Sequence, residues 1–215
     1  MGLFAADTGL TLQPVHPPLG LNMNYVNHPV VTLVLKEKVF SWSGDDFTVT
    51  DTEGRPVVKC SGKMMSMRGR KTITDAWGNY LFTIREKIMS WRTTYLGEDQ
   101  NGTVLFELRN RMSWGSKMSI KFTNASTGQP VALLLKGDMF GRSATIFIED
   151  GPPIAMIKRK GMNVSNLVFD KQTYFVDVAP GVDLALMAAL CILLDEIEND
   201  QSSGGGGGGG DFSFN

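Results

Sequence analysis

The residues best suited to chemistry in this chain form a recurring pattern of a basic side chain, apolar residues, serine and tryptophan. The pattern reads Lys38-Val-Phe-Ser-Trp42, Lys63-Met-Met-Ser-Met67, Lys87-Ile-Met-Ser-Trp91 and, shortened, Arg111-Met-Ser-Trp114. Each Lys or Arg held near an anionic leaflet contributes about 1 kcal/mol of attraction, and Trp rings partition to the lipid–water interface. The pattern therefore fits contact with an anionic lipid surface.

We expect the basic and aromatic groups of these connectors to lie together at one end of the fold. The candidate lipid- or partner-binding residues are Lys63, Arg68, Arg70, Lys71, Lys87, Trp91, Arg92, Arg111 and Trp114. In the structural alternative, Ser-Trp closes the end of the fold and the cations neutralise the acidic end of a C-terminal helix. A third interpretation is a protein or nucleic-acid partner for the same surface, and of these two we expect the protein.

Catalytic chemistry has little support in the sequence. His16 and His28 fall in an irregular segment and Cys191 lies within an apolar run, so no Cys/His or Ser/His/Asp arrangement is recognisable. No spacing of Cys and His matches a zinc site. The run Gly204–Gly210 lacks the flanking strand and helix of a phosphate-binding loop. We expect a non-enzymatic protein without a metal or other cofactor.

The elements that position the basic connectors are predicted to be strands. Turns of the form Asp-x-x-Gly recur every 24 residues, at Asp51–Gly54, Asp75–Gly78 and Asp99–Gly102, where the carboxylate holds the turn and glycine supplies a positive φ. Each repeat is then a hairpin, with these turns at one end of a meander and the basic connectors at the other. About twelve strands are predicted, at Val30–Leu35, Phe47–Thr50, Val57–Cys60, Thr72–Thr74, Tyr80–Ile84, Thr93–Leu96, Val104–Leu108, Met118–Phe122, Val131–Leu135, Ala144–Ile148, Ile154–Ile157 and Tyr174–Val178.

The run from Leu184 to Leu194 is apolar on every side. Such a helix either spans a membrane or is buried at the centre of a fold, and this run is shorter than the ~20 residues that a bilayer requires. We predict a core helix over residues 182–198, with Asp183 at the positive end of its dipole. Closure of the sheet would remove its exposed edges. The predicted fold is α+β, mostly β: a closed barrel of about twelve antiparallel strands around a central hydrophobic C-terminal helix.

The chain is predicted to form one domain with irregular ends. Residues 1–24 form a Pro-rich arm, residues 25–200 the barrel, and residues 201–215 a flexible Gly-rich tail. All 21 Lys and Arg lie between Lys36 and Lys171, and the charged residues that follow are acidic. Two cysteines suit a reducing compartment better than a disulfide scaffold. We expect a cytoplasmic location, with the plasma membrane periphery and the nucleus as alternatives, and neither a signal peptide nor a transmembrane span.

Three stretches together carry a family resemblance: Gly44-Asp-Asp-Phe-Thr-Val-Thr-Asp-Thr-Glu-Gly54, Lys87-Ile-Met-Ser-Trp-Arg92, and the closing segment from Pro180 to Ile197. They resemble the plant LURP-one-related family of the tubby-like C-terminal superfamily, with phospholipid scramblases as more distant relatives. The likeness covers roughly Tyr25 to Glu198. It implies a barrel of about twelve antiparallel strands around a hydrophobic helix, as the patterns above do.

The functional implications of this resemblance are binding and signalling. Tubby domains bind phosphoinositides and have been linked to transcription, and the plant members are associated with defence against pathogens. The acidic stretch of scramblases corresponds here to Asp170–Asp177, which holds two acids and one lysine, fewer ligands than the six to eight oxygens that calcium takes. We expect a module that binds phosphoinositide or other anionic lipid in stress or defence signalling. The alternative is a soluble protein-interaction scaffold, linked to nuclear regulation, without a lipid ligand; the oligomeric state is left open.

Overall fold

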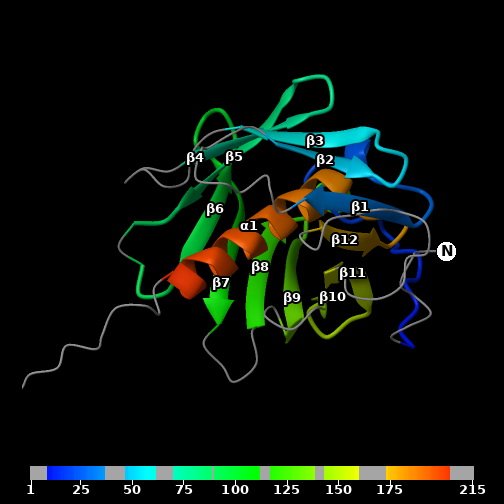
Figure 1. The fold of residues 1–215 in the computed structure, drawn as a ribbon. Helices are drawn as coiled ribbons and strands as arrows, with labels where there is room; N and C mark the ends of the chain where they lie inside the picture. Colours follow the sequence, from blue (N-terminus) through cyan, green and yellow to red (C-terminus); the bar gives the residue numbers. More distant parts are fainter. Residues whose placement is uncertain are drawn as a thin grey trace, which may run out of the picture.

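The computed structural model describes residues 9–36, 47–61, 70–88, 90–111, 117–138, 143–159 and 173–203. Twelve antiparallel strands form a closed barrel around the helix α1 (Leu184–Ser203), as Figure 1 shows. This confirms the predicted fold class. The strands are β1 (Val31–Lys36), β2 (Phe47–Asp51), β3 (Pro56–Ser61), β4 (Arg70–Asp75), β5 (Tyr80–Glu86), β6 (Thr94–Glu98), β7 (Val104–Arg111), β8 (Lys117–Thr123), β9 (Pro130–Asp138), β10 (Ser143–Ile148), β11 (Pro153–Arg159) and β12 (Thr173–Val178).

Each strand pairs with its neighbours in the sequence, and β1 pairs with β12 to close the barrel, with Val31 opposite Val178. An antiparallel meander of this kind returns to the same end after every second strand. The Asp-x-x-Gly turns therefore lie at one end, here named the turn end. The strands β1, β3, β5 and β7 finish at the opposite end, here named the connector end.

The turns form as their sequence predicts. In each one, an oxygen of Asp51, Asp75 or Asp99 accepts the backbone N–H groups of the second and fourth residues after it, at 2.8–2.9 Å. The final glycine of each turn has a φ of +80°, +91° or +82°, a region that L-residues with a Cβ avoid. The local chemistry of four residues thus fixes where each hairpin reverses.

These carboxylates make the stability of the barrel depend on pH. Hydrogen bonds from Thr103 and Asn101 lower the pKa of Asp99. Burial alone would raise the pKa of Asp51 and Asp75, but the hydrogen bonds that they accept outweigh it and lower both. A lowered folded-state pKa adds stability that is present above the unfolded value of about 3.9 and is lost as the pH falls through the folded value.

We therefore expect the free energy of unfolding to decline below about pH 4, and urea denaturation of the wild type and Asp99→Asn from neutral to acid pH checks this. The decline should be shallower in the variant, since one of the responsible groups has been removed. Glu86→Gln, which changes an exposed carboxylate at the end of β5, should follow the wild type. An equal acid dependence of the wild type and Asp99→Asn would contradict the assignment.

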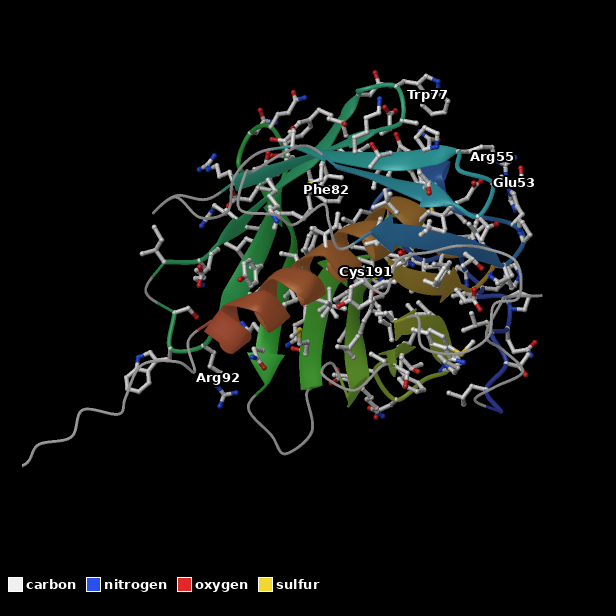
Figure 2. The ribbon with its side chains drawn as sticks, viewed as in Figure 1. Glu53, Arg55, Trp77, Phe82, Arg92 and Cys191 are labelled. Carbon is white, nitrogen blue, oxygen red and sulfur yellow. The ribbon has the colours of Figure 1, made fainter. Side chains whose placement is uncertain are left out.

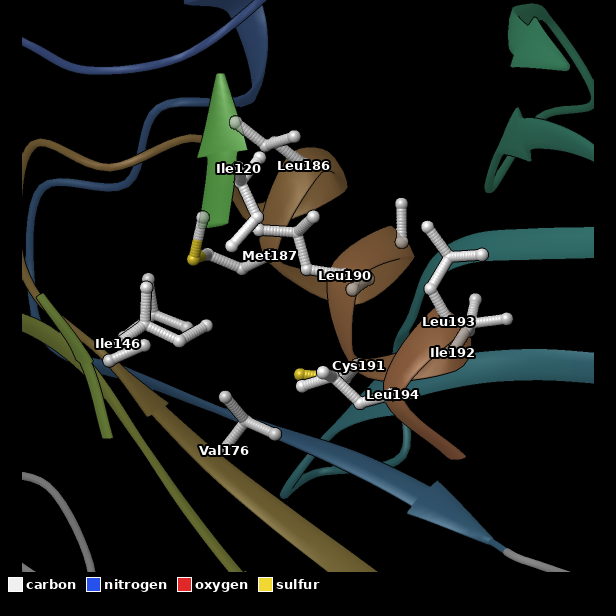
Figure 3. Packing of buried hydrophobic residues seen from close by; sticks show 14 of the residues in the cluster. Ile120, Ile146, Val176, Leu186, Met187, Leu190, Cys191, Ile192, Leu193 and Leu194 are labelled. Carbon is white, nitrogen blue, oxygen red and sulfur yellow. The ribbon is translucent and has the colours of Figure 1, made fainter. Parts of the chain in front are cut away.

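The helix fills the barrel. Leu186, Leu190 and Leu193 are fully buried, and the surrounding wall contributes buried residues such as Ile120 and Ile146, which face the helix in Figure 3. At 20 residues, α1 is about 30 Å long. Within the described ranges, no helix combines the length and the hydropathy that a bilayer span demands.

The helix begins and ends later than the predicted range of 182–198. Its first residue is Leu184 because Asp183 is the N-cap: Oδ1 of Asp183 accepts the N–H groups of Ala185 and Leu186, which the start of a helix otherwise leaves unsatisfied. It continues to Ser203, just before the run of glycines, which is the first strong helix breaker after Leu184.

The N-terminal segment crosses the turn end of the barrel, on the side where α1 begins (Figure 1). Its apolar residues Leu12, Val15 and Leu19 are buried in the main core. The backbone N–H groups of Val15 and Leu19 donate to the carbonyls of Pro180 and Gly181 at 2.9 and 2.8 Å. The described part of the predicted irregular arm therefore closes the barrel. Residues 1–8 and, from the predicted tail, residues 204–215 lie outside the described ranges.

Candidate functional site

The structure separates the nine predicted binding residues into three groups. Lys63, Arg68 and Trp114 lie outside the described residues, as does the side chain of Arg111 at the end of β7. Lys71 lies in β4 and is buried. The remaining four, which are Arg70, Lys87, Trp91 and Arg92, are exposed at the connector end.

Lys71 corrects the prediction of one continuous basic surface. Its side chain is 7% exposed and shares a face of β4 with Ile73 and Asp75, which are also buried. Successive side chains of a strand point to opposite faces, so Lys71 is directed toward the barrel interior while Arg70 is directed outward. The sequence carried this signal, because the apolar Ile73 marks the inner face.

The other exposed residues belong to a compact loop between β5 and β6, residues 87–93, here named the basic loop. Its ends are joined where the N–H of Lys87 donates to the carbonyl of Thr94 at 2.8 Å. The hydroxyl of Thr94 donates to the carbonyl of Arg92 at 2.9 Å and lies 3.1 Å from the hydroxyl oxygen of Ser90. These bonds define the shape of the loop; Met89 lies outside the described residues.

The basic loop presents apolar and cationic side chains together. Trp91 is fully exposed and Ile88 is 68% exposed. Lys87 and Arg92 on the same loop are exposed as well. In Figure 2, Arg92 lies at the edge of the molecule toward which the C-terminal end of α1 points. Exposed apolar residues that are grouped and bordered by polar residues mark interaction sites, so this loop is the candidate site.

Lys87 and Arg92 of the basic loop differ in their ion pairing from Arg55, Arg85 and Arg109. Arg85, just before the loop, donates from Nε to both carboxylate oxygens of Glu98 at 2.9 Å, and Glu98 raises its pKa. Arg55 and Arg109 likewise form ion pairs with nearby acids. Neither Lys87 nor Arg92 forms an ion pair with any residue that the structure describes.

The predicted neutralisation of the helix C-terminus concerns Asp195, Glu196 and Glu198, whose side chains lie outside the described set. The helix enters from the turn end and runs the length of the barrel, so these residues belong to the connector end. Lys71, which is directed inward at that end, suits the neutralising role.

The described residues give little support for a reactive nucleophile or a metal site. Burial raises the pKa of the Cys191 thiol to about 12, so it is protonated at neutral pH and inaccessible, and Cys60 is also buried. Over those same ranges, no three His, Cys, Asp or Glu side chains are grouped to hold a metal ion. The absence of enzymatic activity stays a prediction.

Comparisons with known proteins agree with the architecture. The sequence profile described as LURP-one-related matches residues 31–195. The chain is 23% identical to Protein LURP-one-related 1 of Arabidopsis thaliana over 91% of each chain. It is also 23% identical to Protein LURP-one-related 10 of the same plant, over 80% of this chain and 92% of that one.

A solved structure shows the same fold. The X-ray structure of an Arabidopsis thaliana protein superposes with a TM-score of 0.57 at 19% identity, covering 83% of this chain and 97% of the other. The profile match covers most of the chain and includes all twelve strands and the buried part of α1. The chain belongs to the LURP-one-related family.

Proposed function

We propose that the protein binds anionic lipid, with phosphoinositides as the preferred headgroups, through the connector end of its barrel. The observation that carries the proposal is the fully exposed Trp91 flanked by the exposed cations Lys87 and Arg92 on one hydrogen-bonded loop. We extend the proposal to stress or defence signalling because the plant family that the chain resembles is associated with it.

The physical argument combines two kinds of contact. Indole and aliphatic groups are stabilised at the lipid–water boundary, which suits Trp91 and Ile88. Lys87 and Arg92 meet the anionic phosphates of the same layer. Arg70 adds a third outward cation, since it lies opposite Arg85 in the β4–β5 pair, directly beneath the loop.

Vesicle flotation tests the proposal. The double variant Lys87→Ala/Arg92→Ala should bind vesicles of phosphatidylcholine with phosphatidylinositol bisphosphate about thirtyfold more weakly than the wild type, because two cations near an anionic leaflet contribute about 2 kcal/mol. Binding should also weaken with added salt. Lys121→Ala removes an exposed cation from the middle of β8 and should leave binding unchanged.

Pure phosphatidylcholine vesicles distinguish headgroup attraction from unspecific adsorption, since the wild type should bind them poorly. Equal flotation of the wild type and the double variant would contradict the proposal, as would binding that salt does not affect. Trp91→Ala should weaken binding at high salt as well, because the apolar contact is not screened.

One observation favours the scaffold alternative. Trp77 is 84% exposed at the turn end, on a turn whose Asp75 accepts the N–H groups of Trp77 and Asn79 and the hydroxyl of Tyr25. Exposed Trp on a well-ordered turn is typical of the energetic centres of protein interfaces. If a protein partner binds there, Trp77→Ala should abolish that binding and leave vesicle flotation unchanged.

A further inference from the structure

We propose that Ser90 is a phosphorylation site for a serine/threonine kinase that selects basic residues, and that its phosphate releases the basic loop from anionic lipid. The second half of this inference rests on the proposed function; the first half does not. It follows from the placement of Ser90 on the exposed basic loop, between Lys87 and Arg92 in the sequence.

Ser90 is accessible to another enzyme. Its side chain is exposed and lies between β5 and β6, outside either strand. Its hydroxyl oxygen lies 3.1 Å from that of Thr94, and exchange of this one bond for contacts in a kinase cleft costs little. The neighbours Trp91 and Arg92 are exposed as well, so a kinase can reach the segment on both sides of the serine.

The charges around Ser90 match the requirement of basophilic kinases, whose acidic cleft selects a cation a few residues before the target. Lys87 is three residues before Ser90, and Arg85 is five before it. The same interval separates Lys38 from Ser41 and Lys63 from Ser66. Those two serines lie outside the described residues.

The reaction is transfer of the γ-phosphoryl group of ATP. The oxygen of the Ser90 hydroxyl forms a bond to the γ-phosphorus as the bond from that phosphorus to the β–γ bridging oxygen breaks, and ADP leaves. The hydroxyl proton passes to the base of the kinase and then to solvent. The product carries a charge between about −1.5 and −2 near neutral pH.

That charge would cancel the attraction of the loop for anionic lipid. Lys87 and Arg92 are the exposed cations of the loop, and both are within three residues of Ser90. A phosphate between them offsets both charges and is itself repelled by lipid phosphates. We therefore expect phosphorylation to weaken vesicle binding at least as strongly as removal of both cations, roughly thirtyfold.

The modification is tested without lipid. The full chain is incubated with magnesium ATP and the catalytic subunit of cyclic-AMP-dependent kinase, and the phosphate is located by mass spectrometry. We expect it at Ser90, at a lower rate in Lys87→Ala, because that variant lacks the cation three residues before the serine. Absence of phosphate at Ser90, or an unchanged rate in Lys87→Ala, would overturn the kinase assignment.

The release is tested with phosphoserine incorporated at position 90 during translation, on phosphatidylcholine vesicles that contain phosphatidylinositol bisphosphate. The phosphorylated protein should bind about thirtyfold more weakly, and Ser90→Ala should bind as the wild type does. If the unmodified wild type does not bind these vesicles, the proposed function fails. If the wild type binds and the phosphorylated protein binds equally well, the release mechanism alone fails.

Discussion

Replacement of Leu190 by aspartate is expected to prevent the barrel from folding. Leu190 is fully buried in the apolar first half of α1, among apolar residues of the helix and the wall (Figure 3). A carboxylate there has no partner to offset its desolvation, which costs several kcal/mol. The lost apolar contacts add about 2–5 kcal/mol. Together these approach the entire stability of a typical domain, about 5–15 kcal/mol.

Circular dichroism and urea denaturation of purified protein measure this effect. Leu190→Ala should keep the fold with a free energy of unfolding lower by about 2–5 kcal/mol. Ile88→Asp also replaces an aliphatic side chain by aspartate, but at a residue that is 68% exposed. It should change the free energy of unfolding by less than about 0.5 kcal/mol. A cooperative transition of Leu190→Asp at the wild-type midpoint would contradict the central position of the helix.

The second large effect is expected at Asp183, which joins the N-terminal segment to the helix. Its Oδ2 accepts the N–H groups of Leu21 and Asn22, both at 3.0 Å, and its Oδ1 accepts those of Ala185 and Leu186. Burial raises the pKa of Asp183, and the four hydrogen bonds oppose that rise. One carboxylate therefore satisfies donors from two segments that are distant in sequence.

Asp183→Asn should lower the free energy of unfolding by about 2–6 kcal/mol, because the amide keeps one acceptor oxygen and leaves two N–H groups unsatisfied at about 1–3 kcal/mol each. Asn is a good N-cap, so we expect the remaining side-chain oxygen to keep accepting the N–H groups of Ala185 and Leu186. Hydrogen exchange should then accelerate at Leu21 and Asn22 and change less at Ala185.

Asp150→Asn is the matched control, because Asp150 is exposed and has a φ of +59°, which Asn tolerates. Gly20→Ala should resemble Asp183→Asn, since a Cβ at Gly20 would lie 2.1 Å from the Cβ of Asp183. Uniform acceleration of exchange over the whole barrel would argue against a local attachment of the N-terminal segment.

The sequence by itself determined the elements of the barrel. Strand alternation, the turn chemistry of residues such as Asp75 and Gly78, and the all-apolar surface of α1 are local signals, each carried by a few neighbouring residues. They were sufficient to predict twelve strands, a closed barrel and a central helix, all of which the structure confirms. They also located the exposed residues of the basic loop.

Tertiary structure alone decided what the irregular segments do. Leu12, Val15 and Leu19 have the i, i+3, i+7 spacing of a helix face, but Pro14, Pro17 and Pro18 prevent a helix there. The backbone partners of Val15 and Leu19 lie more than a hundred residues away, at Pro180 and Gly181. Such contacts leave no local pattern, because they depend on where closure of the barrel brings the chain. The alternation of Arg70 and Lys71 in β4 belongs to the strand itself and could be read from Ile73, whereas closure of the sheet around α1 made the face that carries Lys71 the buried one.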